Sequence, residues 1–437
     1  MGTRRSDDFS SITSPPRFGC ANPPINLTSV SSRPLHAVLL PSRDAGERML
    51  EALTAALDGT GPAILPLDPA LPQARIERLI AAFAPRSGVA DDVAAVLPTS
   101  GSTGVPKGAE LSARALLASA RASLDRLGAA PGDRWLCCLP VHHISGLGVL
   151  VRSLVAGTEP VIRDRVDAQM LASDAEVRRC RYVSLVPTQL RRLLDAGSPL
   201  GGFRAILLGG AAIPAGMLEE AAAAGARVVT SYGMTETCGG CVYDGVPLDG
   251  VQVAARADGS IRIAGPVLFS GYRLAPELTS TVLRDGWFTT SDLGEVTASG
   301  RLVVRGRADD VINTGGEKVV AGEVEQVLRD CPGVGDAVIV GISDPDWGER
   351  VTAVIIPADA AAPPAHDELR AYVRDRLPRY AAPQTAVFVT ELPMLSSGKP
   401  DRQKIKDIVV SRAESAVCAA PGPPSPPEAG IWEIPAR

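Results

Sequence analysis

A run of small, hydroxylated and conformationally permissive residues in the first quarter of the chain ends in a lysine. It reads TSGSTGVPK from Thr99 to Lys107. Glycines permit positive φ and let backbone N–H groups converge on an anion, while hydroxyls add donors. The lysine supplies a mobile positive charge. The stretch predicts a phosphate-binding loop, with contacts from Thr99, Ser100, Gly101, Ser102, Thr103, Gly104 and Lys107.

This loop differs from the Walker phosphate loop, whose pattern is G-x-x-x-x-G-K-[ST]. Gly101 and Gly104 stand too close together, and the lysine follows a proline rather than a glycine. A plain Ser/Gly linker is the alternative. We favour a structured loop because the run lies between an apolar strand pattern (94–99) and a helical pattern (113–128).

The pair Cys238 and Cys241 forms an isolated C-x-x-C motif. Such a pair is typical of redox or zinc sites, but a zinc site needs further ligands at a suitable spacing, and none is visible. Reduced thiols in a cytosolic protein are therefore the favoured interpretation.

Five motifs occur in the same order as in the acyl-adenylate-forming enzymes, which include acyl-CoA synthetases, luciferases and peptide-synthetase adenylation domains. The chain resembles that family over residues 36 to about 412. The motifs are TSGSTGVPKGAELS (99–112), SYGMTET (231–237), WFTTSDLG (287–294), GRADDVINTGGEKV (306–319) and SSGKPDR (396–402). The resemblance implies two half-reactions: a carboxylate attacks the α-phosphate of ATP and releases pyrophosphate, and a thiol then displaces AMP.

The resemblance also assigns roles in the first half-reaction. Lys399 would bridge the acid and the phosphate, and Glu236 would bind Mg²⁺, an ion that prefers carboxylate oxygen. Thr235 would lie beside the α-phosphate and Tyr232 against the adenine. Asp292 would accept hydrogen bonds from both ribose hydroxyls.

Further implied residues belong to the junction and to the CoA path. Arg307 would hold ATP phosphates or ribose, and Asp309 matches the hinge position about which the small domain rotates. Gly315 and Gly316 would line the pantetheine tunnel, where a side chain would block passage.

The acid is indicated by LPVHHISGLGVL (139–150), which resembles the acyl-pocket motif in which a histidine, here His143, faces the carboxylate. The neighbouring His142 is more simply read as a packed residue. In detail, SYGMTETCGGCVYDGVPLDGV (231–251) resembles the o-succinylbenzoate–CoA ligases of menaquinone synthesis. A ligase for another aryl or dicarboxylic acid, or an adenylation enzyme that loads a carrier protein, remains an alternative.

Arg152 is the candidate partner for the second carboxylate of such an acid. On a helix it would share a face with Ser145 and Gly148. A charge in so apolar a segment needs a partner or solvent. The alternative is an arginine that reaches solvent or pairs with a structural carboxylate. The weaker pocket candidates are Ser184, Thr188, Gln189, Gly209 and Gly210.

Short apolar runs alternate with helical patterns between the two ends of the chain, which favours an α/β fold. After Gly250, glycine-punctuated strands predict a β-rich subdomain, and the last part predicts a mobile α+β unit hinged at 305–310. The expected division is a disordered tail (1–35), a large ATP- and acyl-binding domain (36–305), a small lid domain (306–412) and a proline-rich disordered tail (413–437).

Composition limits the function further. A chain of 437 residues with 45% hydrophobic residues can form several cores, at about 100–200 residues per domain. A net charge of −5 gives no basic footprint for nucleic acid. No apolar run approaches membrane-spanning length, and no signal peptide is visible. We expect a cytoplasmic enzyme that uses a small carboxylic acid, ATP, Mg²⁺ and CoA; a homo-oligomer is left open.

Overall fold

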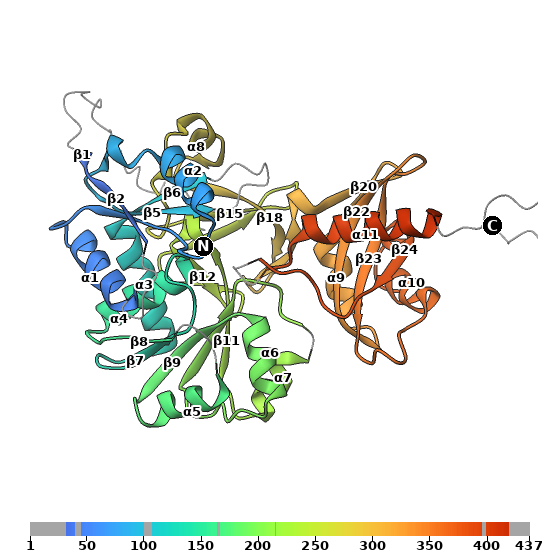
Figure 1. Ribbon diagram of the computed structural model, residues 1–437, viewed down its shortest axis with the longest axis horizontal. Coiled ribbons are helices and arrows are strands. Elements are labelled where there is room, and N and C mark those ends of the chain that lie inside the picture. Colours follow the sequence, from blue (N-terminus) through green and yellow to red (C-terminus); the bar gives the residue numbers. More distant parts are fainter. Residues whose placement is uncertain are drawn as a thin grey trace, which may run out of the picture.

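The computed structural model describes residues 32–39, 45–99, 107–163, 167–214, 216–395 and 399–418. Most of both expected tails and residues 100–106 of the expected phosphate loop lie outside this part. Figure 1 shows a large body built from the blue to yellow elements beside a smaller body built from the orange and red ones.

A seven-stranded sheet forms the centre of the large body, in the order β13-β12-β11-β10-β9-β7-β8. The pairings among β8, β7, β9, β10 and β11 are parallel. Such strands are typically buried on both faces and read as continuous apolar runs, and the runs at 181–187, 204–210 and 226–233 predict β9, β10 and β11 in this way. The strands are β7 (Arg134–Cys137), β8 (Val161–Ile162), β9 (Cys180–Leu185), β10 (Ala205–Gly209), β11 (Val228–Met234), β12 (Gly239–Tyr243) and β13 (Val246–Pro247).

Helices cover both faces of this sheet. Leu171 of α5, Leu190 of α6 and Met217 of α7 share one apolar cluster with Val183 and Ile206 of the sheet. The opposite face packs against α3 and α4, which also contact the next sheet. The bounds are α3 (Ala113–Leu127), α4 (Ile144–Val155), α5 (Ala168–Glu176), α6 (Pro187–Asp195) and α7 (Met217–Ala223).

A second sheet of five strands has the order β16-β6-β5-β3-β2. Its apolar core joins Leu53 of α1, Leu97 of β5 and Leu116 of α3. The elements are β2 (Leu35–Val38), α1 (Ala45–Leu57), β3 (Ala63–Pro66), α2 (Gln73–Phe83), η1 (Pro85–Ser87), β5 (Val93–Thr99), β6 (Lys107–Ser112) and β16 (Gly271–Tyr272).

Strand β6 corrects one expectation, since the loop after Thr99 leads into a strand and not directly into a helix. β6 pairs antiparallel with β5, so that Lys107 lies opposite Thr99. The segment KGAELS carries one large apolar residue, Leu111, so its own pattern does not indicate a strand. Its extended form comes from pairing with β5 on one side and β16 on the other, a case in which tertiary context decides a strand.

A strand also lies before residue 36, where the large domain was expected to start. β1 (Ser32–Arg33) pairs with β4 (Val89–Ala90). The Arg33 side chain is buried and donates hydrogen bonds to the carbonyl oxygens of Ala56 at 2.7 Å and Gly61 at 2.8 Å. A charged residue inside a polar run gives no sequence signal for such burial.

The β-rich part predicted after residue 250 is a five-stranded sheet in which β15 and β19 both pair with β18. Its elements are β14 (Gln252–Ala255), β15 (Ser260–Ala264), α8 (Pro276–Val282), β17 (Leu283–Arg284), β18 (Trp287–Val296) and β19 (Leu302–Arg307). The turn η2 (Thr235–Thr237) follows β11 and precedes β12.

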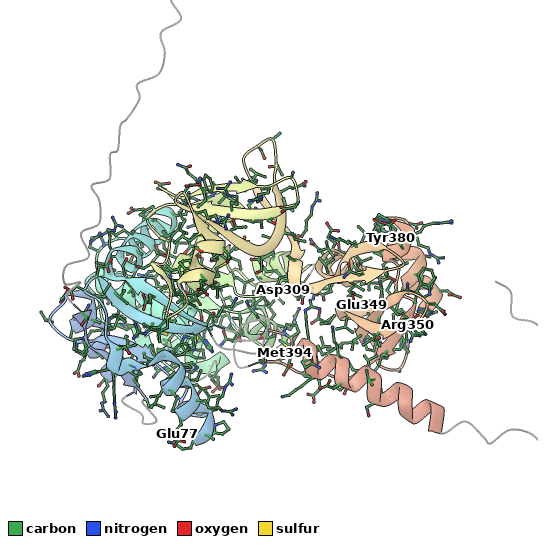
Figure 2. The ribbon with its side chains drawn as sticks, turned by 90° about the horizontal axis from the view of Figure 1, so that it is seen from above. Glu77, Asp309, Glu349, Arg350, Tyr380 and Met394 are labelled. Atoms are coloured by element: carbon green, nitrogen blue, oxygen red, sulfur yellow. The ribbon has the colours of Figure 1, made fainter. Side chains whose placement is uncertain are left out.

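The smaller body has its own sheet and its own apolar cluster, in which Ile312, Leu328 and Leu369 meet. Figure 2 shows Asp309 and Met394 where the two bodies meet. The elements are η3 (Ala308–Asp310), β20 (Val311–Thr314), β21 (Glu317–Val320), α9 (Ala321–Arg329), β22 (Val334–Asp344), β23 (Gly348–Pro357), α10 (His366–Arg374), η4 (Arg379–Ala381), β24 (Thr385–Phe388) and α11 (Arg402–Cys418). In the described part, no helix is long and apolar enough to cross a membrane.

Candidate active site

The predicted site residues gather at the carboxyl ends of the parallel strands. His143 follows β7, Ser184 stands near the end of β9, Gly209 ends β10, and Thr235 and Glu236 follow β11. Ligands of open α/β sheets bind outside this edge. The topology therefore places together residues that are nearly a hundred positions apart.

Asp292 on β18 contacts two other predicted nucleotide residues, Tyr232 and Arg307. Its buried carboxylate accepts a hydrogen bond from the Tyr232 hydroxyl at 2.8 Å on one oxygen and from Arg307 at 3.1 Å on the other. Arg307 also donates to Asp309 at 2.9 Å. Each carboxylate oxygen has two lone pairs, so both can still accept the ribose hydroxyls that the motif predicts.

Glu236, the predicted magnesium ligand, accepts a hydrogen bond from the hydroxyl of Tyr272 at 2.8 Å on Oε1. The described residues contain no group of three or more side chains that could hold a metal ion. Mg²⁺ is commonly bound by one or two carboxylates together with substrate phosphates and water. A single half-buried carboxylate fits a magnesium ion that arrives with the nucleotide.

Lys399 is brought to this carboxylate cluster from the far end of the chain. Its side chain keeps contact with solvent, yet the surrounding protein atoms lower the pKa of the ammonium by desolvation. Arg307 lowers this pKa further, whereas Asp292 and Glu236 act in the opposite direction. Lys399 therefore lies within electrostatic reach of both predicted nucleotide carboxylates. Residues 396–398 of its motif lie outside the described residues.

His143 caps the amino end of α4 and has a buried Nε2 atom with no hydrogen-bond partner in the described part. Burial and the neighbouring His142 lower the pKa of His143 to about 4. The imidazole is therefore neutral near pH 7. His142 lies 3.8 Å from the Asp68 carboxylate. A buried nitrogen without a partner needs one, and a bound carboxylate or water suits it.

Arg152 is buried within α4. Its guanidinium lies 4.4 Å above the centroid of the Trp135 ring, and one nitrogen donates to the Ser184 hydroxyl at 3.1 Å. Its Nε has no partner, and no carboxylate pairs with it among the described residues. The sequence pattern missed the aromatic contact because Trp135 lies on a different element.

The other predicted residues differ in whether the protein itself already binds their side chains. Gln189 accepts a hydrogen bond from Val186 N at 3.2 Å and donates to Cys138 O at 3.1 Å, so its amide is engaged by the backbone. Thr188 and Gly210 lie at the edge of the site, half-buried and exposed, respectively. Thr99 and Lys107 are half-buried, and Ser100, Gly101, Ser102, Thr103 and Gly104 lie outside the described residues.

The glycines Gly315 and Gly316 turn between β20 and β21. Both have positive φ, 58° and 84°, and both are exposed. This conformation favours glycine. The place of both glycines in a pantetheine tunnel stays a prediction.

In the C-x-x-C pair, Cys238 follows η2 and Cys241 lies in β12. Both Cys238 and Cys241 are free and buried. Burial raises the pKa of the Cys241 thiol to about 12. A protonated thiol is neither a good nucleophile nor a metal ligand.

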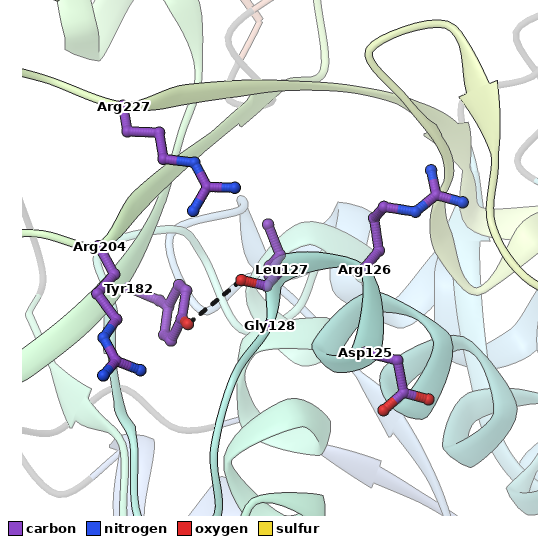
Figure 3. A pocket seen from close by; sticks show the side chains of 7 residues that line it. All are labelled: Asp125, Arg126, Leu127, Gly128, Tyr182, Arg204 and Arg227. Atoms are coloured by element: carbon purple, nitrogen blue, oxygen red, sulfur yellow. Dashed lines mark hydrogen bonds between the residues drawn. The ribbon is translucent and has the colours of Figure 1, made fainter.

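An open hollow of about 460 Å³ lies away from the candidate site, at the amino ends of β10 and β11. Arg204 and Arg227 stand on its rim, and the Tyr182 hydroxyl donates to Leu127 O at 3.5 Å within it (Figure 3). Arg204 is already paired with Asp133 at 2.9 Å. The hollow therefore belongs to the opposite edge of the sheet from the predicted ATP residues.

Comparison with known proteins agrees with this geometry. Residues 70–306 match the family described as AMP-binding enzyme, and residues 323–399 match the AMP-binding enzyme C-terminal domain. A probable 2-succinylbenzoate–CoA ligase from Mycobacterium tuberculosis is 43% identical over 380 residues, covering 84% of this chain and 97% of that protein. The 2-succinylbenzoate–CoA ligase of Bacillus licheniformis is 34% identical, covering 72% of this chain and 70% of that protein.

Solved structures show the same architecture. The o-succinylbenzoate CoA synthetase of Bacillus subtilis, in complex with its acyl-adenylate intermediate, superposes with a TM-score of 0.70 at 27% identity, covering 85% of this chain and 88% of the other. ATP-bound MatB from Rhodopseudomonas palustris gives a TM-score of 0.75 at 26% identity, covering 87% and 89%. The chain therefore belongs to the AMP-binding enzyme family, the acyl-adenylate-forming enzymes that its motifs resemble.

Proposed function

We propose that the protein joins CoA to 2-succinylbenzoate in an ATP-dependent reaction that proceeds through an acyl-adenylate and releases pyrophosphate and AMP. The observation that carries the adenylation step is that Lys399 lies within electrostatic reach of Asp292, Glu236 and His143. The identity of the acid rests on the relatives, which are named as ligases of this substrate.

In the first half-reaction, an acid carboxylate oxygen attacks the α-phosphorus of ATP and pyrophosphate leaves. Negative charge grows on the phosphate oxygens, so cations fixed in advance lower the barrier. Lys399 binds the acid and the α-phosphate together. When it is bound at Glu236, Mg²⁺ neutralises phosphate charge. The neutral His143 orients the acid without adding a competing charge.

In the second half-reaction, the CoA sulfur attacks the acyl carbon of the adenylate, forms the thioester and expels AMP. The small body therefore needs one position to deliver Lys399 in the first half-reaction and another to form the pantetheine path in the second. Asp309 lies in η3 between the two bodies, where a change in backbone angles rotates one against the other. Gly315 and Gly316 would then line the path of the thiol.

The acid has a second carboxylate, for which Arg152 is the proposed partner. A buried guanidinium without a counter-charge is costly, and an anion that enters beside it relieves the cost. The hydroxyl of Ser184, on β9, accepts a hydrogen bond from the Arg152 guanidinium at 3.1 Å. These residues support a dicarboxylic substrate over an aryl acid with a single carboxylate. Free, buried thiols are consistent with action in the cytoplasm.

The test is a panel of acids assayed for pyrophosphate release with ATP, Mg²⁺ and CoA. The panel contains 2-succinylbenzoate, 4-oxo-4-phenylbutanoate (which lacks the ring carboxylate), benzoate, succinate and malonate. We expect 2-succinylbenzoate to have the highest kcat/KM, with the product detected as its CoA thioester. A higher kcat/KM for another acid would make that acid the substrate. Transfer of the acyl group to a carrier protein in place of CoA would make the carrier protein the acceptor.

A further inference from the structure

We propose that Tyr272 is a positioning residue that fixes the Glu236 carboxylate for the nucleotide-bound metal and links it to Lys107. This inference rests on the proposed function and assigns a role to a residue outside the five motifs.

The segment that carries Tyr272 is attached on two sides. On one side, the backbone N–H of Phe269 donates to the carbonyl oxygen of Glu236 at 2.9 Å. On the other side, β16 pairs with β6, and Arg273 N donates to Gly108 O at 2.7 Å. The segment therefore connects the turn that bears Glu236 to the strand that begins with the loop lysine.

The Tyr272 side chain is held as firmly as its backbone. Only 8% of the residue is exposed, and its ring packs edge-on against Phe269 at a centroid distance of 4.9 Å. The hydroxyl of Tyr272 is the donor, because an ionised carboxylate can only accept. That donor lies 2.8 Å from Oε1 of Glu236.

Two consequences follow for the ligands. A hydrogen bond to one carboxylate oxygen fixes the plane of the group and leaves the other oxygen for a cation. Partners of this kind typically change metal affinity by about 10- to 100-fold. The Nζ atom of Lys107 also lies 5.4 Å from the Tyr272 ring centroid, a cation–π contact. One side chain therefore orients both the metal carboxylate and the phosphate-loop cation.

Tyr272→Phe separates these functions, because it removes the hydroxyl and keeps the ring beneath Lys107. Tyr372→Phe is the matched control. Tyr372 lies in α10 and donates to Asp330 O at 2.7 Å, far from the nucleotide residues in sequence and on the smaller body. A purely structural role would predict similar effects of both substitutions.

The measurement is Mn²⁺ binding, followed by electron paramagnetic resonance, in the presence of α,β-methylene-ATP and without acid or CoA. For Tyr272→Phe we expect the Kd of Mn²⁺ to rise by about tenfold or more. Nucleotide affinity without metal should stay at the wild-type value, as should both affinities in Tyr372→Phe. Tyr272→Leu should in addition weaken metal-free nucleotide binding, because Lys107 loses the ring.

An unchanged Kd of Mn²⁺ in a folded Tyr272→Phe protein would overturn the inference and leave the proposed function standing. Failure of the wild-type protein to bind Mn²⁺ with the nucleotide would contradict both. Because no acid is present, the identity of the substrate does not affect the result.

Discussion

Arg152 combines a buried positive charge with neighbours that do not neutralise it, namely an aromatic ring and a hydroxyl. We predict that Arg152→Ala raises the KM for 2-succinylbenzoate by about 10- to 100-fold, the range of a charge-assisted hydrogen bond. The KM for ATP should stay unchanged. Steady-state kinetics with each substrate varied in turn provide the measurement.

The control for this substitution is Arg204→Ala, which removes an exposed arginine at the opposite edge of the sheet. It should leave both KM values as they are. If Arg152→Ala also keeps the wild-type KM for the acid, Arg152 does not contact the substrate.

His143 gives a prediction for the dependence of stability on pH. Its pKa in the folded protein is about 4, below the value of about 6.5 for an unfolded chain. Above pH 6.5 the imidazole is neutral in both states, and no stability is lost. As the pH falls from there toward 4, the unfolded state gains a proton first, so the free energy of unfolding decreases.

We therefore expect wild-type protein to lose about 2 kcal/mol more than His143→Asn between about pH 7.5 and pH 5. Urea unfolding at the two pH values provides the measurement, with His366→Asn on α10 as the control. Equal losses in wild type and His143→Asn would show that the imidazole is not held neutral.

Among the elements, the contact between β10 and β11 depends on Gly209. A Cβ atom at this position would lie 2.5 Å from the carbonyl oxygen of Ser231. We predict that Gly209→Ala forces the strands apart and lowers the free energy of unfolding by about 1–3 kcal/mol, as other overpacked sites do. At Gly201, a Cβ would meet Gly225 O at 3.4 Å, and Gly201→Ala should change stability by less than about 0.5 kcal/mol.

Urea unfolding of the two variants tests this difference. Gly209→Ala should also raise the KM for the acid, because the carboxyl ends of both strands form the candidate site. Equal stability of the two alanine variants would mean that β10 adapts to the added methyl group.

The elements that could be predicted are those whose burial requires a regular pattern of apolar residues. The strands β9, β10 and β11 are apolar runs, and their neighbouring helices show clear periodicity. By contrast, β6 and β1 are extended because of their pairing partners, and their own residues are mostly small or polar. No local property of such segments distinguishes them from loops.

For the whole molecule, motif resemblance predicted most of the candidate residues but few of their contacts. The Tyr232–Asp292 pair spans 60 positions and the Tyr272–Glu236 pair spans 36. Spacing along the chain does not encode such pairs, because each joins the end of the seven-stranded sheet to a different sheet. Asp292 lies on β18 of the β-rich sheet, and Tyr272 lies on β16 of the second sheet. The division into domains and the role of each site residue remain predictions.

The proposed site draws its charged residues from both bodies. Lys399 comes from the smaller body and approaches Asp292 and Glu236 of the larger one. If Lys399 serves adenylation alone, its loss should stop the first half-reaction and spare the second, in which the proposed rotation has already withdrawn it.

The most direct measurement compares the two half-reactions in Lys399→Ala and wild-type protein, with 2-succinylbenzoate as the acid. Pyrophosphate release from ATP reports the first step, and thioester formation from synthetic 2-succinylbenzoyl-adenylate and CoA reports the second. We predict that Lys399→Ala lowers the first rate by at least about 100-fold, as expected for a group that stabilises developing charge, while the second rate stays near that of the wild type. Loss of both rates together, or of neither, would contradict a site in which Lys399 is delivered for adenylation alone.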